Sequence, residues 1–314
     1  MLYGKYDFSV TFQTEALLPP YKGSTFRGIF GHALKRVTCA LKHQDCGDCI
    51  LRLKCVYPFV FETAFAGNGD NADKRIAAPP HPYVIDVADC EHTHFKTGET
   101  LVFTLKLFGR ANEFLPYFVY AFDHIGTLGI GRSQGGQKGT FVLDSVMSGG
   151  RRIYSSQERK LLDAQPASDL SLRPASPEDL ERRLIGITLK TPLRLKYRNS
   201  FECDLPFHVL VRASLRRISS LKKYHGTGEP DLDYRGLVER AYDVAVKESG
   251  LRWYDWRRYS NRQETDMLMG GLVGEILYEG RVGEYLPLIR FCEEVNVGKQ
   301  TSFGLGRFEV SYLF

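Results

Sequence analysis

The strongest constraint on the fold of this chain is a pattern that occurs twice, once near the end of each half. Residues 129–139 and 297–307 are both rich in glycine, carry Lys and Arg, and precede a stretch that alternates like a β-strand. Either segment alone is typical of a plain hairpin connection. Two in matching positions indicate that the chain contains two copies of one structural unit.

The periodicity of the apolar residues supports this duplication. The second half has the β-α-β-β-α-β order of a ferredoxin-like unit, with predicted strands at 186–198, 252–260, 266–278 and 307–314 and predicted helices at 206–224 and 282–294. The first half has a similar order, with predicted strands at 6–13, 101–108 and 140–146 and predicted helices at 24–41 and 113–128. We therefore predict an α+β fold with two tandem ferredoxin-like domains, each with a glycine-rich loop before its last strand.

With 314 residues, the chain is long enough for two domains that each bury a core. We place the first domain at residues 1–150 and the second at residues 181–314. Residues 151–180 are polar and lack a sustained apolar period, so they are predicted to form a linker with a short helix near 156–162.

The composition, with 43% hydrophobic and 25% charged residues, is that of an ordinary soluble protein. The sequence shows no signal peptide and no stretch long enough to span a membrane, so a cytoplasmic location is expected. The net charge of +5 is mild, but residues 181–223 hold eleven Lys and Arg against three acidic residues. Such a run is equally consistent with a solvated face and with a surface that binds nucleic acid.

The second glycine-rich segment has the chemistry of an anion-binding loop. Glycines allow backbone N–H groups to approach an anion closely, and the flanking Lys299 and Arg307 add positive charge. The segment lacks the G-x-x-x-x-G-K-[ST] order of a nucleotide-binding loop, and no helix follows it. We therefore expect a polyanionic chain as the ligand and no nucleotide cofactor.

Four cysteines within seventeen residues, Cys39, Cys46, Cys49 and Cys55, have the spacing C-x6-C-x2-C-x5-C. In a cytosolic protein this clustering favours a metal over disulfides. Four thiolates suit a structural zinc ion in a tetrahedral site, and an iron–sulfur cluster is the alternative. The spacing does not separate these two, and four unligated thiols are the simplest interpretation. We predict a metal-braced insertion at about residues 39–55 of the first domain.

The predicted helix at 24–41 combines an apolar stripe with a basic face. Ser24 is a good candidate for its N-cap. Gly28, His32 and Arg36 are spaced i, i+4, i+8 and share one surface of the helix. A glycine inside a helix costs about 1 kcal/mol relative to alanine, so we expect another element or RNA to pack closely there.

Several segments together carry a family resemblance. They are the Gly-x-Gly that follows Ser302 and Phe303, the run Thr191-Pro192-Leu193-Arg194-Leu195, and residues 253–260, 270–274 and 21–28. The chain resembles the CRISPR-associated RAMP endoribonucleases that process precursor CRISPR RNA. The resemblance implies two ferredoxin-like domains and cleavage within the repeats by 2′-OH attack, without a catalytic metal. The products would carry a 2′,3′-cyclic phosphate and a 5′-OH.

The same resemblance, with the chemistry of the residues, suggests the site. Such cleavage needs a base for the 2′-OH, an acid for the 5′ oxygen and cations for the phosphate, and His32 can serve as base or acid. The family order of a Tyr before this histidine and a Lys after it matches Tyr21 and Lys35, although a solvated helix histidine is the simpler interpretation. The predicted RNA contacts are Arg27, Arg36, Arg132, Lys138, Arg194, Lys299, Ser302, Phe303, which could stack on a base, and Arg307.

Two other functions remain open from the sequence. The chain could be a non-catalytic RAMP subunit that binds mature guide RNA among the subunits of a CRISPR effector complex. It could also be a metal-binding structural protein without an RNA partner, which would explain the cysteines but neither glycine-rich segment. Salt-sensitive RNA binding would exclude this last alternative.

Overall fold

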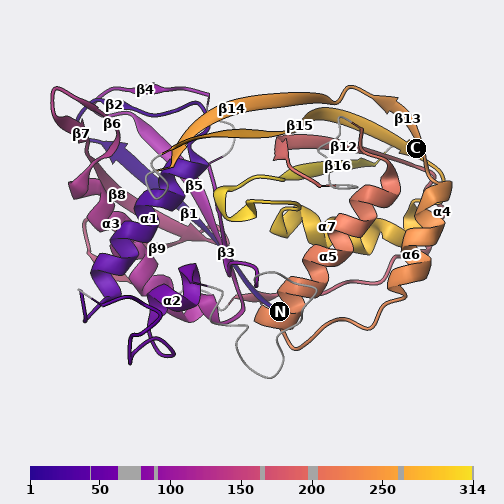
Figure 1. The fold of residues 1–314 in the computed structure, drawn as a ribbon, viewed down its shortest axis with the longest axis horizontal. Coiled ribbons are helices and arrows are strands. Elements are labelled where there is room, and N and C mark those ends of the chain that lie inside the picture. The colour runs from indigo at the N-terminus through magenta and orange to yellow at the C-terminus, as the bar shows by residue number, and fades with distance from the viewer. Residues whose placement is uncertain are drawn as a thin grey trace. The chain divides into compact units, whose positions relative to one another are not determined.

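The structure is a computed structural model that describes residues 1–42, 44–62, 79–87, 91–162, 167–196, 204–260 and 265–312. The chain folds into two compact units (Figure 1). The first comprises Met1–Asp169 and Tyr224–Thr227, and the second comprises Leu170–Lys223 and Gly228–Phe314. Among the described residues the strands form three antiparallel sheets, so the fold is α+β as predicted.

The longest strand of the first unit, β1 (Leu2–Phe12), lies inside the large sheet of that unit. It pairs with β5 (Thr100–Phe108) on one side and with β8 (Phe141–Ser148) on the other, and its alternate side chains are buried. These three strands confirm the predictions at 6–13, 101–108 and 140–146. The sheet has the order β10-β9-β8-β1-β5-β3 with β11 paired to β1, where the further strands are β3 (Tyr83–Asp86), β9 (Arg151–Ser155), β10 (Lys160–Leu161) and β11 (Ser168–Asp169).

The helices of the first unit bury an aromatic cluster. They are α1 (Gly23–Thr38), α2 (Val56–Phe61) and α3 (Leu115–Leu128), and a 3-10 turn at Gly109–Phe114 leads into α3. Phe30 of α1 is fully buried, and its ring stacks on that of Phe122 of α3 with centroids 4.8 Å apart. The apolar stripe of the predicted helix at 24–41 therefore faces the core, although the helix ends at Thr38.

The prediction that Ser24 caps α1 is wrong. The helix begins at Gly23, and its N-cap is Lys22, which makes no capping side-chain hydrogen bond. Lys22 is only 1% exposed, and its Nζ lies 5.7 Å from the centre of the Phe95 ring. The helix therefore begins earlier than a serine N-cap predicts, and the residue at the N-cap is buried.

The segment predicted to be a linker, residues 151–180, is folded over much of its length. β9 pairs with β8, and β10 pairs with β9, so a hairpin stands where a short helix was predicted at 156–162. β11 pairs with the beginning of β1, and α4 (Pro177–Glu181) follows. The polar composition of the segment reflects its exposed position at the edge of the sheet.

The second unit contains one antiparallel sheet. The order of its strands is β13-β15-β12-β16, with β14 also paired to β15, and β12 lies between β15 and β16. The strands are β12 (Leu184–Leu193), β13 (Ala245–Ser249), β14 (Arg252–Ser260), β15 (Thr265–Glu279) and β16 (Phe308–Tyr312), and the helices are α5 (Phe207–His225), whose last two residues belong to the first unit, α6 (Tyr234–Arg240) and α7 (Leu286–Val295).

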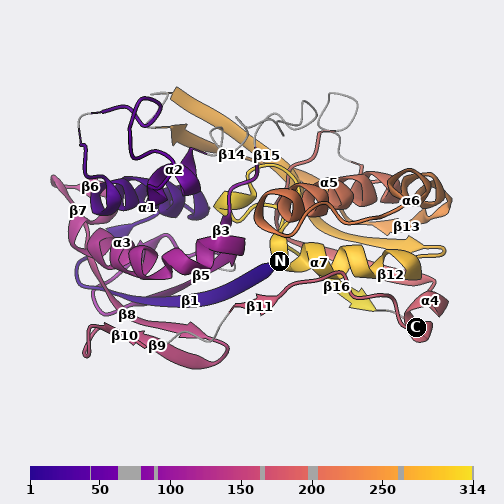
Figure 2. The same cartoon turned by 90° about the horizontal axis from the view of Figure 1, so that it is seen from below.

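Helices α5 and α7 cover one face of this sheet and lie next to each other in both views (Figures 1 and 2). Phe207 of α5 packs edge-on against Tyr278 of β15, with ring centroids 4.9 Å apart. Ile185, Ile187 and Leu189 of β12 point to the same buried face, while Thr188 between them is partly exposed on the other. The sheet therefore has one covered face and one open face within this unit.

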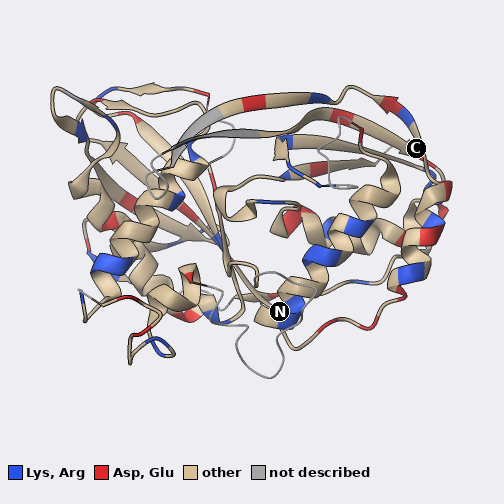
Figure 3. Cartoon of the chain, in the orientation of Figure 1, with Lys and Arg blue, Asp and Glu red and all other residues tan. Residues whose placement is uncertain are grey.

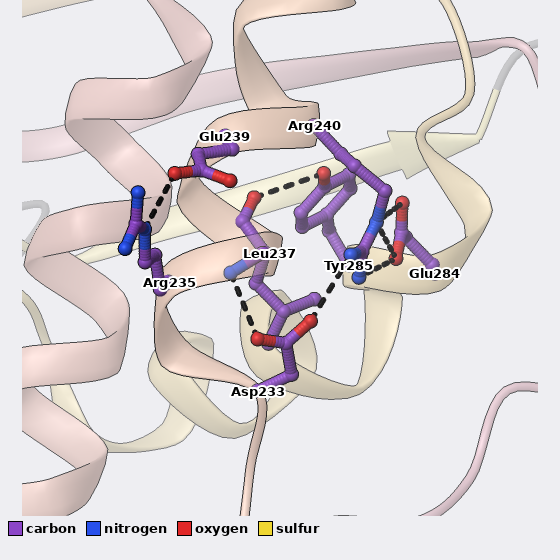
Figure 4. Close-up of polar contacts among 8 residues, drawn as sticks. Asp233, Arg235, Leu237, Glu239, Arg240, Glu284 and Tyr285 are labelled. Atoms are coloured by element: carbon purple, nitrogen blue, oxygen red, sulfur yellow. Dashed lines mark hydrogen bonds and ion pairs between the residues drawn. The ribbon is translucent and has the colours of Figure 1, made fainter.

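A polar network fixes the short helix α6 (Figure 4). The side chain of Asp233 accepts a hydrogen bond from the backbone N–H of Gly236 at 2.8 Å and caps the helix. Arg240 at its other end pairs with Glu284 at 2.8 Å, and the Tyr285 hydroxyl donates to the Leu237 carbonyl at 3.1 Å. Helix α6 buries none of its own residues, so these polar contacts hold it in place instead of apolar packing.

A buried carboxylate ties the start of the second unit to α7. Ser176 and Asp179 form a capping box at the N-terminus of α4, and Asp179 accepts two hydrogen bonds of 2.7 Å from the guanidinium of Arg290. These hydrogen bonds from Arg290 hold the pKa of Asp179 well below its ordinary value, although burial acts in the opposite direction.

We expect Asp179→Asn to lower the free energy of unfolding at pH 7 by about 1–3 kcal/mol, because Arg290 loses a charged partner. The folded-state pKa is depressed, so the contribution of Asp179 is complete above its unfolded pKa of about 3.9 and is lost as the pH falls below that value. Urea titrations from pH 7 to pH 3 should therefore show a shallower loss of stability in the variant. Glu178→Gln, an exposed neighbour on α4, is the control, and equal pH profiles for Asp179→Asn and wild type would contradict the assignment.

Candidate functional site

The candidate catalytic residues of the first unit lie on or beside α1. His32 and Arg36 are exposed one turn apart, and among the described residues neither side chain forms a hydrogen bond or an ion pair. A Cβ added to Gly28, one turn before His32, would meet nothing within 4 Å, whereas one added to Gly31 would meet the Phe61 ring at 3.0 Å. The expected close packing is therefore found at Gly31, and the surface at Gly28 is open to a ligand.

Lys35 and Arg27 flank this exposed face but contact aromatic rings. The Lys35 Nζ lies 5.4 Å from the centre of the Tyr57 ring, and the Arg27 guanidinium lies 5.0 Å from that of Phe61. Both side chains are half-buried, so their charges are held near the helix surface. Lys35 follows His32 by three residues, whereas the Nε of Arg27 is buried against the core.

Tyr21 is less suited to the role predicted for it. Tyr21 precedes the first residue of α1, and from Gly23 to His32 the helix rises about 14 Å along its axis, at 1.5 Å per residue. Burial raises the pKa of Tyr21 well above 10, and the nearby Asp86 carboxylate adds to this shift. The structure thus places His32 and Lys35 on adjacent turns and leaves Tyr21 at the far end of the helix as a neutral phenol.

The cysteine segment follows α1 directly. Cys39 is the C-cap of α1, Cys55 is the N-cap of α2, and Cys46 is 8% exposed. Burial raises the pKa of the Cys46 thiol, the charge of Lys35 lowers it, and Cys39 and Cys55 are near enough to raise it further. In the part of the chain that the structure describes, no group of three or more His, Cys, Asp or Glu is arranged to hold a metal ion.

The first glycine-rich segment forms a hairpin rather than an open loop. β6 (Ile130–Gln134) and β7 (Gln137–Gly139) pair with each other in a small sheet of order β4-β2-β6-β7, which also contains β2 (Ala16–Leu17) and β4 (His94–Phe95). Gly135 and Gly136 form the turn with positive φ angles of 56° and 87°. The structure therefore contains the plain hairpin connection that the sequence left open for this segment. Arg132 and Lys138 are exposed on its strands.

The second glycine-rich segment is packed into its own unit. Backbone N–H groups of Val297, Lys299, Gly304 and Gly306 donate to protein carbonyls at 2.8–3.1 Å, so they are not available to an anion. Gly306 has a φ of +73°, and a Cβ there would meet the Val297 carbonyl oxygen at 1.7 Å. The glycines serve backbone geometry and close approach here, which corrects the interpretation of these amides as an anion-binding loop.

Two predicted RNA contacts in this segment are buried. Ser302 is 6% exposed and Phe303 is 7% exposed, because the 3-10 turn Thr301–Phe303 carries both side chains inward. Neither residue is presented at the surface in this structure, and their contacts with RNA stay predictions.

Three cations remain at the surface of the loop and the end of β12. The backbone N–H of Lys299 donates to the Arg194 carbonyl at 2.9 Å, which brings these two residues together, and Lys196 is exposed close by in sequence. The Arg194 Nη1 donates to the Gly270 carbonyl of β15 at 3.2 Å. Arg307 lies 3.6 Å from Glu309, so its charge is partly neutralised. We refer to Arg194, Lys196 two residues later in the sequence, and Lys299 as the basic cluster.

The sequence did not predict the buried hydrogen bonds that hold the second glycine-rich segment in place. Arg217 of α5 is buried and donates to the carbonyls of Val295 and Asn296 at 2.8–3.3 Å, where α7 ends. The Asn296 amide donates to the Gly304 and Leu305 carbonyls, and the Thr191 hydroxyl donates to Gly304 at 2.7 Å. The sequence marked Thr191 within a family segment and Arg217 within a basic run, but neither signal indicates that they meet.

Comparisons with known proteins cover both units. Residues 1–167, more than half of the chain, match the family AF_1859_N, described as an N-terminal domain, and the first unit belongs to it. Residues 187–308 match the family described as CRISPR-associated endoribonuclease Cas6. The chain therefore contains a domain of the Cas6 endoribonuclease family. An uncharacterised protein of Archaeoglobus fulgidus is 23% identical to this chain over 297 residues, which are 93% of this chain and 92% of that protein.

Solved structures of Cas6 proteins share this fold. Thermus thermophilus Cas6 aligns with a TM-score of 0.56 and 13% identity over 99% of this chain and 98% of that one. A Cas6 product complex aligns with a TM-score of 0.57 and 15% identity over 99% of both chains. A partial Cas6-RT-Cas1–Cas2 complex gives a TM-score of 0.62 with 13% identity, and this chain spans only 46% of that chain. Across the described residues of this chain, no helix is long and apolar enough to cross a membrane.

Removal of the buried Arg217 guanidinium should loosen the second glycine-rich segment. We expect Arg217→Met to lower the free energy of unfolding by about 2–4 kcal/mol, because buried carbonyls lose a charged donor. Hydrogen exchange at the amides of Lys299, Gly304 and Gly306 should accelerate more than exchange in β12. Arg216→Met, an exposed neighbour on α5, should change neither measurement. Unchanged amide protection in Arg217→Met would contradict the bracing role.

Proposed function

We propose that this chain cleaves precursor CRISPR RNA within its repeats, with His32 as the acid–base residue. The observation that carries the proposal is the open face of α1 in a chain with a domain of this family. There an exposed imidazole lies one turn from Arg36 and close to Lys35. An imidazole is the side chain best suited to take or give a proton at physiological pH.

The reaction is a transesterification that needs no water. The 2′-oxygen attacks the adjacent phosphorus as it loses its proton, and the bond to the 5′ oxygen breaks as that oxygen gains a proton. The products are a 2′,3′-cyclic phosphate and a 5′-OH. Arg36, Lys35 and Arg27 supply positive charge for the crowded phosphate on the first unit. On the second unit, the basic cluster of Arg194, Lys196 and Lys299 is suited to the phosphate backbone.

The second unit also supports the finer fold assignment. Strand β12, helix α5, strands β14 and β15, helix α7 and strand β16 occur in β-α-β-β-α-β order, with α6 and β13 inserted after α5. In the sheet, the first strand lies between the third and the fourth. We propose on this basis that the second unit is a ferredoxin-like domain, and that the first is a more elaborated version of it.

The test is cleavage of the cognate repeat RNA by the purified full chain in excess EDTA. We expect wild-type protein to cut at one position and His32→Ala to cut about 10²- to 10⁴-fold more slowly, with unchanged RNA affinity. His94→Ala is the matched control, because His94 is an exposed histidine of the same unit, 49% accessible.

Each outcome decides between stated alternatives. Cleavage that survives in His32→Ala would refute the assignment of His32 and keep the nuclease. Tight RNA binding by wild-type protein without any cut would refute the nuclease and favour a subunit that holds guide RNA among effector subunits. A cut that requires a divalent ion would contradict the metal-independent mechanism.

We further propose that Cys39, Cys46, Cys49 and Cys55 hold a structural zinc ion. The donor set fits, because four thiolates complete a tetrahedral site and leave no open position for catalysis. Cys39 and Cys55 lie within electrostatic reach of Cys46, and the charge of Lys35 opposes the burial that raises the pKa of the Cys46 thiol. Bound zinc would link the end of α1 to the start of α2.

We expect elemental analysis of the purified protein to find one zinc per chain and no visible absorbance of an iron–sulfur cluster. Cys46→Ser together with Cys49→Ser should lose the metal and lower the melting temperature of the protein. Cys292→Ala, which removes a buried thiol of the second unit, should retain it. Protein that carries no metal after expression in zinc-supplemented medium would contradict the proposal, and iron with sulfide would favour the cluster instead.

A further inference from the structure

Strand β14 presents a row of three side chains that the proposed function does not use. Arg252, Tyr254 and Trp256 alternate along the strand and therefore point to the same side of the sheet. Their partners on β15 are Val273, Gly271 and Met269 in the antiparallel register. The Tyr254 and Trp256 rings are nearly parallel, with centroids 6.0 Å apart and an interplanar angle of 24°.

This row lies on the open face of the second unit. On β15, Leu272, Ile276 and Tyr278 are buried toward α5 and α7, so the residues between them point away from these helices. The row on β14 pairs with Val273, Gly271 and Met269, which alternate with the residues of β15 that face the helices. Tyr254 is 41% exposed, and Arg252 is exposed as well.

The opposite side of β14 carries a hydrogen-bonded pair of side chains, of which Trp253 is half-buried and Asp255 is exposed. The Trp253 indole N–H donates to the Asp255 carboxylate at 2.8 Å. A Cβ on Gly270 would meet both side chains at 2.1–2.6 Å, so glycine makes room for this pair. The Gly270 carbonyl in turn accepts the hydrogen bond from Arg194. The row on β14 is thereby connected through one residue to the basic cluster.

The charges on the open face favour a polyanion at β14. Two of its carboxylates form ion pairs: Glu309 lies 3.4 Å from Lys190, and Glu279 lies 2.9 Å from Lys247. Glu248 of β13, whose register partner is Leu277, is exposed and forms no ion pair among the described residues. Glu275 accepts a hydrogen bond from Thr188. Arg252, by contrast, has no ion pair among the described residues, and Asp255 points to the other side of the strand.

We propose that Tyr254 and Trp256 form a platform on which unpaired bases of the RNA stack, with Arg252 holding an adjacent phosphate. The inference rests on the proposed RNA substrate and deepens it, because it assigns a site to a single-stranded segment. Flat rings stack on any base, whereas a base pair inside a duplex offers no open ring face. The Gly271 partner of Tyr254 adds no side chain beside its ring.

The test compares binding of single-stranded repeat RNA with binding of the same strand annealed to its complement, by fluorescence anisotropy. We expect Tyr254→Ala to weaken single-strand binding by roughly 5- to 100-fold and to leave duplex binding unchanged. Tyr254→Phe keeps the ring and should bind like wild type. Tyr117→Ala, an exposed tyrosine of the first unit, is the matched control, since Tyr117 is 46% exposed.

Salt dependence separates the aromatic part of the site from the cationic part. Arg252→Ala should lower the slope of log affinity against log salt concentration by about 0.7, whereas Tyr254→Ala should leave the slope unchanged. Affinity of Tyr254→Ala within twofold of Tyr117→Ala would overturn the platform while the RNA-binding function stands. Equal losses for single strand and duplex would also overturn it. Absence of any RNA binding by wild-type protein would instead refute the proposed function.

Discussion

The guanidinium of Arg217 lies inside the second unit, and its hydrogen bonds go to carbonyl groups at the C-terminus of α7. Burial lowers the pKa of Arg217 to about 10, so the group is still charged at neutral pH. Its positive charge meets the negative end of the helix dipole, which offsets part of the desolvation cost. Asn296, at the point where this helix ends, then anchors the glycine-rich segment. The surface position of Lys299 depends on this buried pairing.

The two glycine-rich segments look alike in sequence and differ in structure. The first is a hairpin whose turn requires positive φ angles at Gly135 and Gly136. The second is a packed loop, in which Gly306 lies against the Val297 carbonyl. In both, the glycines satisfy backbone geometry, and the charge that could meet RNA comes from lysine and arginine side chains at their edges. The chemistry proposed for these surfaces therefore rests on side chains, with the loops as supports.

Helix α1 combines three roles along its length. Phe30 anchors the helix in the aromatic core, His32 and Arg36 stand on its exposed face, and Cys39 at its end begins the cysteine segment. Lys35 connects the exposed face with the cysteine segment. It follows His32 by less than one turn, and its charge lowers the pKa of the Cys46 thiol, against the effect of burial. A metal that orders the cysteine segment would thus also affect the charge beside the proposed acid–base residue. On the second unit, Gly270 connects β14 to the basic cluster, because it lies beside Trp253 and Asp255 and its carbonyl accepts a hydrogen bond from Arg194.

The sequence by itself determined many of the secondary elements and the family resemblance, because apolar periodicity and short motifs are local properties of the chain. It indicated β1, α1, β8, α5 and β16, and it marked His32 on an exposed helix face. It did not reveal that Phe303 and Ser302 turn inward, that α1 begins at Gly23 with Lys22 as its N-cap, or that β9, β10 and β11 extend a sheet. Those outcomes depend on which distant groups compete for the same hydrogen bonds and the same buried volume. Only the tertiary structure decides that competition, as it does where Arg217 meets the end of α7.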